Sequence, residues 1–394
     1  MGRRAGWYAL VIGATLWGAG LYLRLPILAV PPLVPGIHGD LAMNEAATGA
    51  LTTLPALLFA IAAVPGSFLI ARWGARRTLL WGLLASSLAA AVRGAVVSTW
   101  WLFLMTLLMG AGIAVMQPAL PSLVRRWWPE HVGFGTALYT NGILSGELIA
   151  AGTTLPWLLP LLDGSWRLVF VAWSVPAVGV AALIVSLHRD DRRDRPLREE
   201  PAAASLRDWW PRWTDGRGWL IALILGAISS SYLGTNSLLP DYLHGAGAAG
   251  TLPSALAALN GTQLVASAIS LLFANRLVGR RVPFLVLGAS GCVALVGLTL
   301  TPAALAPLWC GLLGFCTSLM LVLTLALPAM IVGSEETHRL SAMMFTIGYG
   351  MAFCVPLLGG VLWDATGVAL LSFVPFMLLL ALIGPMALAI RFRE

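Results

Sequence analysis

Three charged residues lie inside long apolar stretches of the sequence: Arg24, Arg93 and Glu147. An arginine left in hydrocarbon costs at least about 2.5 to 3.5 kcal/mol on insertion scales, so each charge needs water, a partner or a ligand. A guanidinium offers a planar fork of N–H donors that suits small planar anions. A neighbouring carboxylate gains or loses a proton according to the balance between burial and the arginine's charge.

Arg24 and Glu147 are predicted to lie at a similar depth. At a rise of about 1.5 Å per residue, Arg24 lies roughly 26 Å from the inner end of its apolar stretch and Glu147 roughly 21 Å from that of its own. Arg93 lies roughly 22 Å from the inner end of its stretch, at a similar depth. Two interpretations stay open: Arg24 binds an anionic ligand, or Arg24 and Glu147 form a fixed ion pair that joins two helices. Glu147 is likewise either a proton-coupling group or a permanently ionised counterion.

No residue pattern indicates an enzyme, and we expect no catalytic residue, no metal and no cofactor. The histidines form no metal-ligand spacing, and His338 is among those expected to be solvated at helix ends or loops. The cysteines lie inside apolar runs without a CxxC pair. They are therefore expected to be small core residues: Cys292, Cys310, Cys316 and Cys354.

The composition indicates an all-α integral membrane protein. Apolar residues make up 59% of the chain and charged residues 10%, and the mean hydropathy is +0.86, far outside the range of soluble domains. A helix needs about 20 apolar residues to cross a bilayer, and twelve runs satisfy this. The predicted spans are 7–34, 48–70, 78–97, 100–124, 133–158, 167–187, 219–240, 253–274, 283–300, 307–332, 340–362 and 368–390.

The placement of arginines predicts the orientation of these spans. All 24 basic residues are arginine, and all except Arg24, Arg93 and Arg167 fall in segments that face the cytoplasm if the N-terminus does. The positive-inside rule then predicts a multi-pass protein of a bacterial inner membrane with both termini cytoplasmic. The sequence pI of about 9.8 is therefore a topology signal, and no nucleic-acid partner is expected.

A hydrophilic stretch at residues 188–218 divides the chain near its middle. It mixes both charge signs with Pro and Ala, which is typical of a linker, so we expect two six-helix halves at 1–187 and 219–394. Trp209, Trp210 and Trp213 at its end indicate either a segment lying at the headgroup level or an unstructured tether whose tryptophans anchor the seventh span.

The two halves contain a repeat. ARWGARR at residues 71–77 follows Pro35, and NRLVGRR at 275–281 follows Pro240, with nearly equal spacing. A matched pair at matched spacing predicts duplicated six-helix units.

Several longer segments carry a resemblance to a known family. They are GAGIAVMQPALPSLVRRWWP (110–129), GTALYTNGILSG (135–146), GSWRLVFVAWSVPA (164–177) and LSAMMFTIGYGMAFCVPLLGGVLWDATG (340–367). With LYLRLPI around Arg24, they resemble the cyanate and 2-nitroimidazole porter branch of the major facilitator superfamily. The repeated loops also look like that superfamily's signature, although Ala71 stands where an aspartate is usual. Phe345 and Glu147 replace a common glutamine and a common small residue of the branch.

The resemblance implies a major facilitator fold that transports by rocking its two halves about a site near the membrane midplane, without a cofactor. It places the first and fifth spans against the central cavity, which favours substrate contact for Arg24. It places the third span at the periphery, which favours a packing or snorkelling Arg93. Arg167 is expected to anchor the start of the sixth span.

Polar residues within the spans are predicted to complete a substrate site with Arg24 and Glu147, although each could instead hydrogen-bond only between helices. They are Tyr22, Gln117, Tyr139, Asn141, Tyr232, Asn236, Asn260, Gln263 and Tyr349.

The predicted function is transport of a small anionic or polar organic solute by a monomer surrounded by membrane lipids, with protons as the candidate coupling ion. The alternative is a proton-coupled drug or metabolite efflux antiporter of the same superfamily. Against it, the first span carries Arg24 rather than a carboxylate, and the fifth lacks a GPxxGG pattern.

Overall fold

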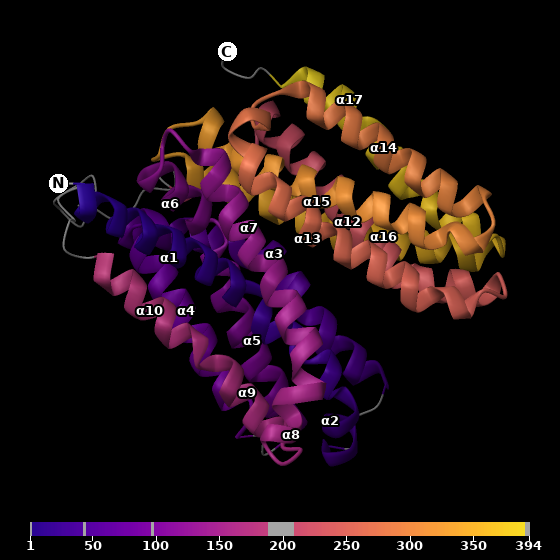
Figure 1. The fold of residues 1–394 in the computed structure, drawn as a ribbon, viewed down its shortest axis with the longest axis horizontal. Helices are drawn as coiled ribbons and strands as arrows, with labels where there is room; N and C mark the ends of the chain where they lie inside the picture. Colours follow the sequence, from indigo (N-terminus) through magenta and orange to yellow (C-terminus); the bar gives the residue numbers. More distant parts are fainter. Residues whose placement is uncertain (1, 42–44, 96–97, 188–208, 391–394) are drawn as a thin grey trace. The chain divides into compact units, whose positions relative to one another are not determined.

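The part of the chain that the structure describes is built from helices. The computed structural model describes residues 2–41, 45–95, 98–187 and 209–390, and every regular element in these ranges is a helix (Figure 1). Up to residue 187 these are α1 (Gly2–Leu28), η1 (Pro31–Leu33), α2 (Val34–Leu41), α3 (Glu45–Trp73), α4 (Ala75–Val92), α5 (Thr99–Met116), α6 (Ala119–Trp127), α7 (Val132–Thr153), η2 (Thr154–Leu158), α8 (Leu159–Leu161), α9 (Trp166–Ser174) and α10 (Pro176–Ser186). From residue 209 on they include α12 (Gly216–Gly245), η4 (Ala249–Thr251), α13 (Leu252–Leu277), α14 (Arg281–Leu300), η5 (Ala303–Leu305), α15 (Ala306–Ile331), α16 (Thr337–Thr366), η6 (Ala369–Phe373) and α17 (Val374–Ala389).

Each of the twelve predicted spans corresponds to one helix or to one run of consecutive helices. Among the described residues, nine helices are long and apolar enough to cross a membrane, and a pair bent by 46° at the end of α7 makes a tenth. The other two are α3, with its apolar part at Leu57–Trp73, and α4, whose first turn carries Arg76 and Arg77. Two spans break at Pro118 and Pro176, because proline lacks the N–H that continues a helix. The all-α membrane fold is confirmed.

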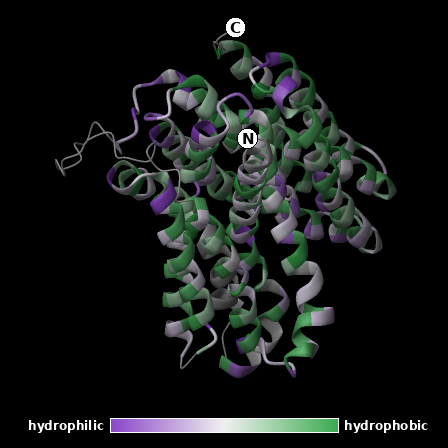
Figure 2. Cartoon of the chain, turned by 60° about the vertical axis from the view of Figure 1, so that its left-hand side comes forward, coloured by the Kyte–Doolittle hydropathy of each residue, from purple (hydrophilic) through white to green (hydrophobic). Residues whose placement is uncertain are grey.

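Large apolar side chains cover the outer faces of these helices, as lipid contact requires. Figure 2 shows apolar residues along most of the helical length. Trp7, Trp100 and Trp157 are largely exposed and lie near the ends of spans, where indole rings favour the level of the lipid headgroups.

The chain divides into two compact units. Unit 1 comprises Met1–Glu130, Leu138–Pro211 and Ser334–Ala342, and unit 2 comprises His131–Ala137, Arg212–Gly333 and Met343–Glu394. Helices α7 and α16 therefore contribute residues to both units.

In each unit, an arginine that follows a glycine of positive φ by two residues donates a hydrogen bond to the C-terminal end of another helix. We call this contact an arginine cap. Gly74 and Gly279 have φ angles of 82° and 81°, in the left-handed region that glycine adopts without steric cost. Two residues later, Nε of Arg76 donates to a carbonyl in the last turn of α10 at 3.1 Å. Likewise, Nη2 of Arg281 donates to the carbonyl of Ile390, directly after α17, at 3.1 Å. This equivalence agrees with the repeat predicted from ARWGARR and NRLVGRR.

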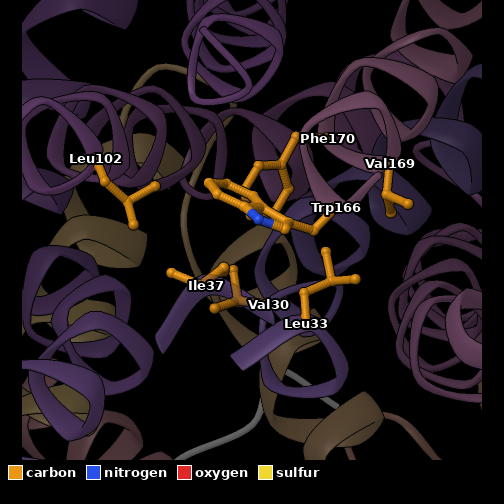
Figure 3. Packing of buried hydrophobic residues seen from close by; sticks show 7 residues of the cluster. All are labelled: Val30, Leu33, Ile37, Leu102, Trp166, Val169 and Phe170. Carbon is orange, nitrogen blue, oxygen red and sulfur yellow. The ribbon is translucent and has the colours of Figure 1, made fainter. Parts of the chain in front are cut away.

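An apolar cluster in unit 1 joins the chain after α1 to α5 and α9 (Figure 3). It consists of Val30, Leu33, Ile37, Leu102, Trp166, Val169 and Phe170. Beside it, Oδ2 of Asp40 accepts from Nε1 of Trp166 at 2.9 Å and from Nη1 of Arg167 at 2.7 Å. The guanidinium of Arg167 also stacks on the Trp166 ring, with Cζ 4.4 Å from its centroid. Arg167 is thus confirmed as an anchor of the start of α9.

The end of the linker that the structure describes, from Trp209 on, contacts helix α3. Residues 188–208, most of the predicted linker, lie outside the described residues. Oγ of Ser67 in α3 donates to the carbonyl of Trp209 at 2.7 Å, and the Trp209 and Phe68 rings pack edge to face at 5.2 Å. Nε of Arg339 donates to the carbonyl of Trp210 at 3.0 Å. Trp209 therefore packs on α3, and the two arrangements considered for the three tryptophans stay predictions.

Two expectations about single side chains are wrong. His338 is only 5% exposed, because α16 begins at Thr337 and its first turn is packed. Cys354 is exposed on α16, whereas Cys310 and Cys316 are buried as predicted. A sequence gives the limits of a helix better than it gives the face on which a residue lies.

Candidate functional site

Three glycines set the distance between α1 and α7 within unit 1. A Cβ added at Gly20 would collide with the carbonyl of Tyr139, and one added at Gly142 or Gly146 would collide with carbonyls of α1. Small residues allow membrane helices to approach until their backbones touch. Side chains just beyond this crossing are therefore close neighbours.

Arg24 and Glu147 face one another directly beyond the crossing. Nε of Arg24 lies 3.3 Å from Oε1 of Glu147, and each side chain is 22% exposed. The guanidinium also faces Phe59 of α3, with Cζ 5.5 Å from the ring centroid, a favourable cation–π arrangement. Arg24 and Glu147, for which the sequence predicted only a similar depth, are thus in contact, and the pair is partly accessible rather than sealed.

A second polar contact joins the same two helices. Nε1 of Trp17 donates to Oδ1 of Asn141 at 3.0 Å. Trp17 precedes Arg24 by seven residues, about two turns along one face of α1. Tyr139 and Gln117 are buried, and Gln117 ends α5 at the break before α6. Of these predicted residues, Asn141 shares the α1–α7 interface with Arg24 and Glu147.

Tyr22 and Arg93 lie away from this pair. Tyr22 precedes Arg24 by two residues, a rotation of about 200° around the helix, and it is fully buried. Arg93 is 1% exposed, its Nη2 donates to the carbonyl of Pro26 at 2.8 Å, and its Cζ lies 4.3 Å from the Phe170 ring centroid. Arg93 is therefore a packing residue and does not snorkel to the surface.

Unit 2 contains a polar cluster on α12 and α13. Oη of Tyr232 donates to Oδ1 of Asn260 at 2.6 Å, and Nδ2 of Asn260 donates to Oδ1 of Asn236 at 3.2 Å. Nδ2 of Asn236 donates in turn to the carbonyl of Tyr232 at 3.1 Å. Asn260 is exposed within an apolar helix, so the cluster can offer polar groups to a solute.

Two further residues of unit 2 were predicted for the site, Gln263 and Tyr349. Gln263 is buried, and its carbonyl accepts from Oγ of Ser318 at 3.0 Å. Tyr349 stacks on Phe345 within α16, with ring centroids 5.8 Å apart and an interplanar angle of 12°.

The sequence interpretation missed two residues near the ion pair: Trp17, which hydrogen-bonds to Asn141, and Phe59, whose ring faces Arg24. The seven-residue spacing of Trp17 and Arg24 could have indicated a shared helix face. Nothing in the sequence indicates Phe59, because its contact with Arg24 depends on how α3 is rotated.

The amino-acid sequence matches a family model and two characterised transporters. A family model described as Major Facilitator Superfamily matches residues 10–313. The cyanate transport protein CynX of Escherichia coli (strain K12) is 26% identical over 377 residues, 95% of this chain and 94% of that protein. The 2-nitroimidazole transporter of the same organism is 28% identical over 369 residues, 92% of this chain and 91% of that protein. The resemblance predicted from the sequence is confirmed.

The fold is also similar to that of a solved structure. The crystal structure of FucP, a Major Facilitator Superfamily transporter in the outward conformation, matches with a TM-score of 0.73 and 15% identity, over 95% of this chain and 97% of that chain. The family model covers more than half of the chain, from α1 into α15. The chain therefore belongs to the Major Facilitator Superfamily and is a membrane transporter, not an enzyme.

Proposed function

We propose that this transporter carries a small anionic or polar organic solute across a bacterial inner membrane by alternating access, as a secondary active carrier. The observation that carries the proposal is the Arg24–Glu147 pair, a guanidinium held partly accessible inside a membrane span. Arg24 supplies the only charge of the pair that attracts an anion, and its planar fork suits carboxylate-like groups.

Glu147 gives this site a way to couple transport to protons. When a solute anion replaces Glu147 beside Arg24, the carboxylate loses its counter-charge within the membrane. A neutral carboxylic acid costs less there than an unpaired carboxylate, so Glu147 takes up a proton as the anion binds. One proton then accompanies each solute.

A further polar contact for the solute comes from Asn141, which joins α7 to α1 in the same unit as Arg24 and Glu147. The names of two relatives, a cyanate transport protein and a 2-nitroimidazole transporter, support a small, electronegative solute. The arginine distribution supports cytoplasmic termini, and we propose that a monomer is sufficient for transport.

The test is flux into proteoliposomes that contain the purified protein, with and without a proton gradient. A panel of small inorganic anions, carboxylates and azoles is first screened for a rise in melting temperature, since a ligand of the folded state stabilises it. We expect at least one member to bind and to accumulate when the gradient is imposed. Extrusion of lipophilic drugs, with no binding from the panel, would favour the antiporter alternative.

A further inference from the structure

The ring of Phe59 gives the Arg24 guanidinium a contact with a third helix. Phe59 lies on α3 and is 2% exposed, so the packing around it keeps its ring in one place. Cζ of Arg24 lies 5.5 Å from the ring centroid, within the about 6 Å over which an aromatic ring attracts a cation. The ring therefore restrains a long side chain that otherwise loses much conformational freedom when it binds a ligand.

The contact between Arg24 and Glu147 is loose. Nε of Arg24 lies 3.3 Å from Oε1 of Glu147, whereas a charge-assisted hydrogen bond between such groups is about 2.7 to 2.9 Å long. Both side chains are 22% exposed, so the pair is open to a small anion. A carboxylate held at this distance is easier to replace than one held at the optimal distance. Glu147 is therefore the exchangeable member of the pair, and Arg24, beside a fixed ring, is the stationary one.

We propose that Phe59 is a positioning residue for transport: its ring holds the Arg24 guanidinium in place while the solute anion replaces Glu147. This inference rests on the proposed function, because it concerns the same site. The ring attracts the cation through its quadrupole and does not take up an N–H donor as a carboxylate does. Its attraction therefore persists when the anion arrives, whereas that of Glu147 is given up.

Removal of the ring should weaken anion binding for two reasons. Without the ring, Arg24 would close onto Glu147, and the anion would then have to break a tighter ion pair. The anion alone would also have to order the guanidinium, and that ordering lowers the conformational entropy at the moment of binding. Both effects act through the charge of Arg24, so they differ from a general loss of packing.

The test measures the affinity of the purified full-length protein for formate, nitrate and cyanate. Phe59→Leu should weaken binding of the tightest of these anions about tenfold, the effect of losing one partly desolvated cation–π contact. Phe170→Leu is the matched control, because Phe170 is also buried and its ring centroid lies 4.3 Å from Cζ of the packing residue Arg93. It should lower the melting temperature and leave the affinity unchanged. Equal losses of affinity in the two variants would overturn the proposal.

Fluorinated phenylalanines at position 59 distinguish attraction to the cation from packing. Fluorine draws negative charge away from the ring face and changes the shape of the ring little, so affinity should fall with each added fluorine. In Arg24→Gln, which lacks the cation, Phe59→Leu should cause no further loss.

Two kinds of failure are distinguishable. Affinity that is independent of fluorination, or a further loss in Arg24→Gln, would overturn the role of Phe59 and leave the proposed function standing. A wild-type protein that binds none of the three anions would overturn the anion site at Arg24, and the role of Phe59 with it.

Discussion

The Nε atom of Arg24 and the Oε1 atom of Glu147 lie 3.3 Å apart on two helices whose backbones meet at glycines. Because the pair is neutral as a whole, it can remain within a membrane span without a ligand. An incoming anion must therefore compete with Glu147 for the guanidinium. Substitutions at the two positions should consequently have opposite effects on solute affinity.

Arg24→Gln should weaken solute binding by about 30- to 100-fold, the effect of losing a charge-assisted bidentate contact. Arg24→Lys keeps the charge but not the planar fork, so we expect an intermediate loss. Glu147→Gln removes the competing carboxylate, and affinity should be maintained or improved while gradient-driven accumulation disappears. Affinity is measured by titration of the purified variants, and accumulation in proteoliposomes.

The double variant Arg24→Gln with Glu147→Gln distinguishes substrate binding from a structural ion pair. If Arg24 binds the solute, the double variant should be as weak as Arg24→Gln alone. Near wild-type affinity in the double variant would show instead that Arg24 only compensates the charge of Glu147.

Gly146 should tolerate no side chain. A Cβ at this position meets the backbone of α1, so Gly146→Ala must push α1 and α7 apart. We expect a destabilisation of about 1 to 3 kcal/mol, typical of overpacking, together with loss of solute binding as Arg24 and Glu147 separate. Gly152→Ala is the control on the same helix, because no atom lies within 4 Å of its added Cβ. Equal melting temperatures for the two variants would contradict the close crossing.

The two arginine caps should differ in their contribution to stability. Arg76 is buried and Arg281 is exposed, although both donate to helix-end carbonyls. Arg76→Met should destabilise the protein by about 1.5 to 3 kcal/mol, as expected for a buried hydrogen bond from a charged group, and Arg281→Met by less. Arg77→Met, at an exposed neighbour, is the control for loss of charge in that loop. Thermal unfolding in detergent measures all three, and an equal effect of Arg76→Met and Arg77→Met would argue against the cap.

The sequence predicted how far along a helix a residue lies better than it predicted the face of the helix on which the residue lies. Apolar run lengths and arginine-bearing loops predicted twelve spans, and counting residues brought Arg24 and Glu147 to one level. Tyr22 was predicted to complete the substrate site with Arg24, but the two residues between their positions turn it to another face of the helix. The contact of Trp209 with α3 was equally out of reach, because it depends on tertiary packing that no local pattern encodes.

A cysteine in the linker tests the predicted orientation. Ser205→Cys, in a Cys354→Ala background that removes the exposed native thiol, should resist a membrane-impermeant thiol reagent in intact cells and react after permeabilisation. Ser254→Cys, at an exposed position near the start of α13, should react in intact cells, because it lies at the opposite end of a span. The reverse pattern would invert the topology.

Asp40 should make stability depend on pH at the acidic end. Hydrogen bonds from Trp166 and Arg167 hold the pKa of Asp40 below its ordinary value of 3.8, because both stabilise the ionised carboxylate. The unfolded chain therefore takes up this proton at a higher pH than the folded protein. The contribution of Asp40 is complete above the ordinary value and is lost as the pH falls through the lower pKa of the folded state.

Asp40→Asn should accordingly lower the melting temperature at neutral pH and reduce its decline with acid, when melting is followed from pH 7 to pH values below 3.8. Because Asp40 and Arg167 are substantially exposed, salt screens their attraction, and the difference between the two proteins should shrink at high ionic strength. Arg167→Gln removes one of the two donors and should give a smaller change than Asp40→Asn, since Trp166 still binds the carboxylate. A decline with acid that is identical in wild type and Asp40→Asn would show that this contact does not stabilise the start of α9.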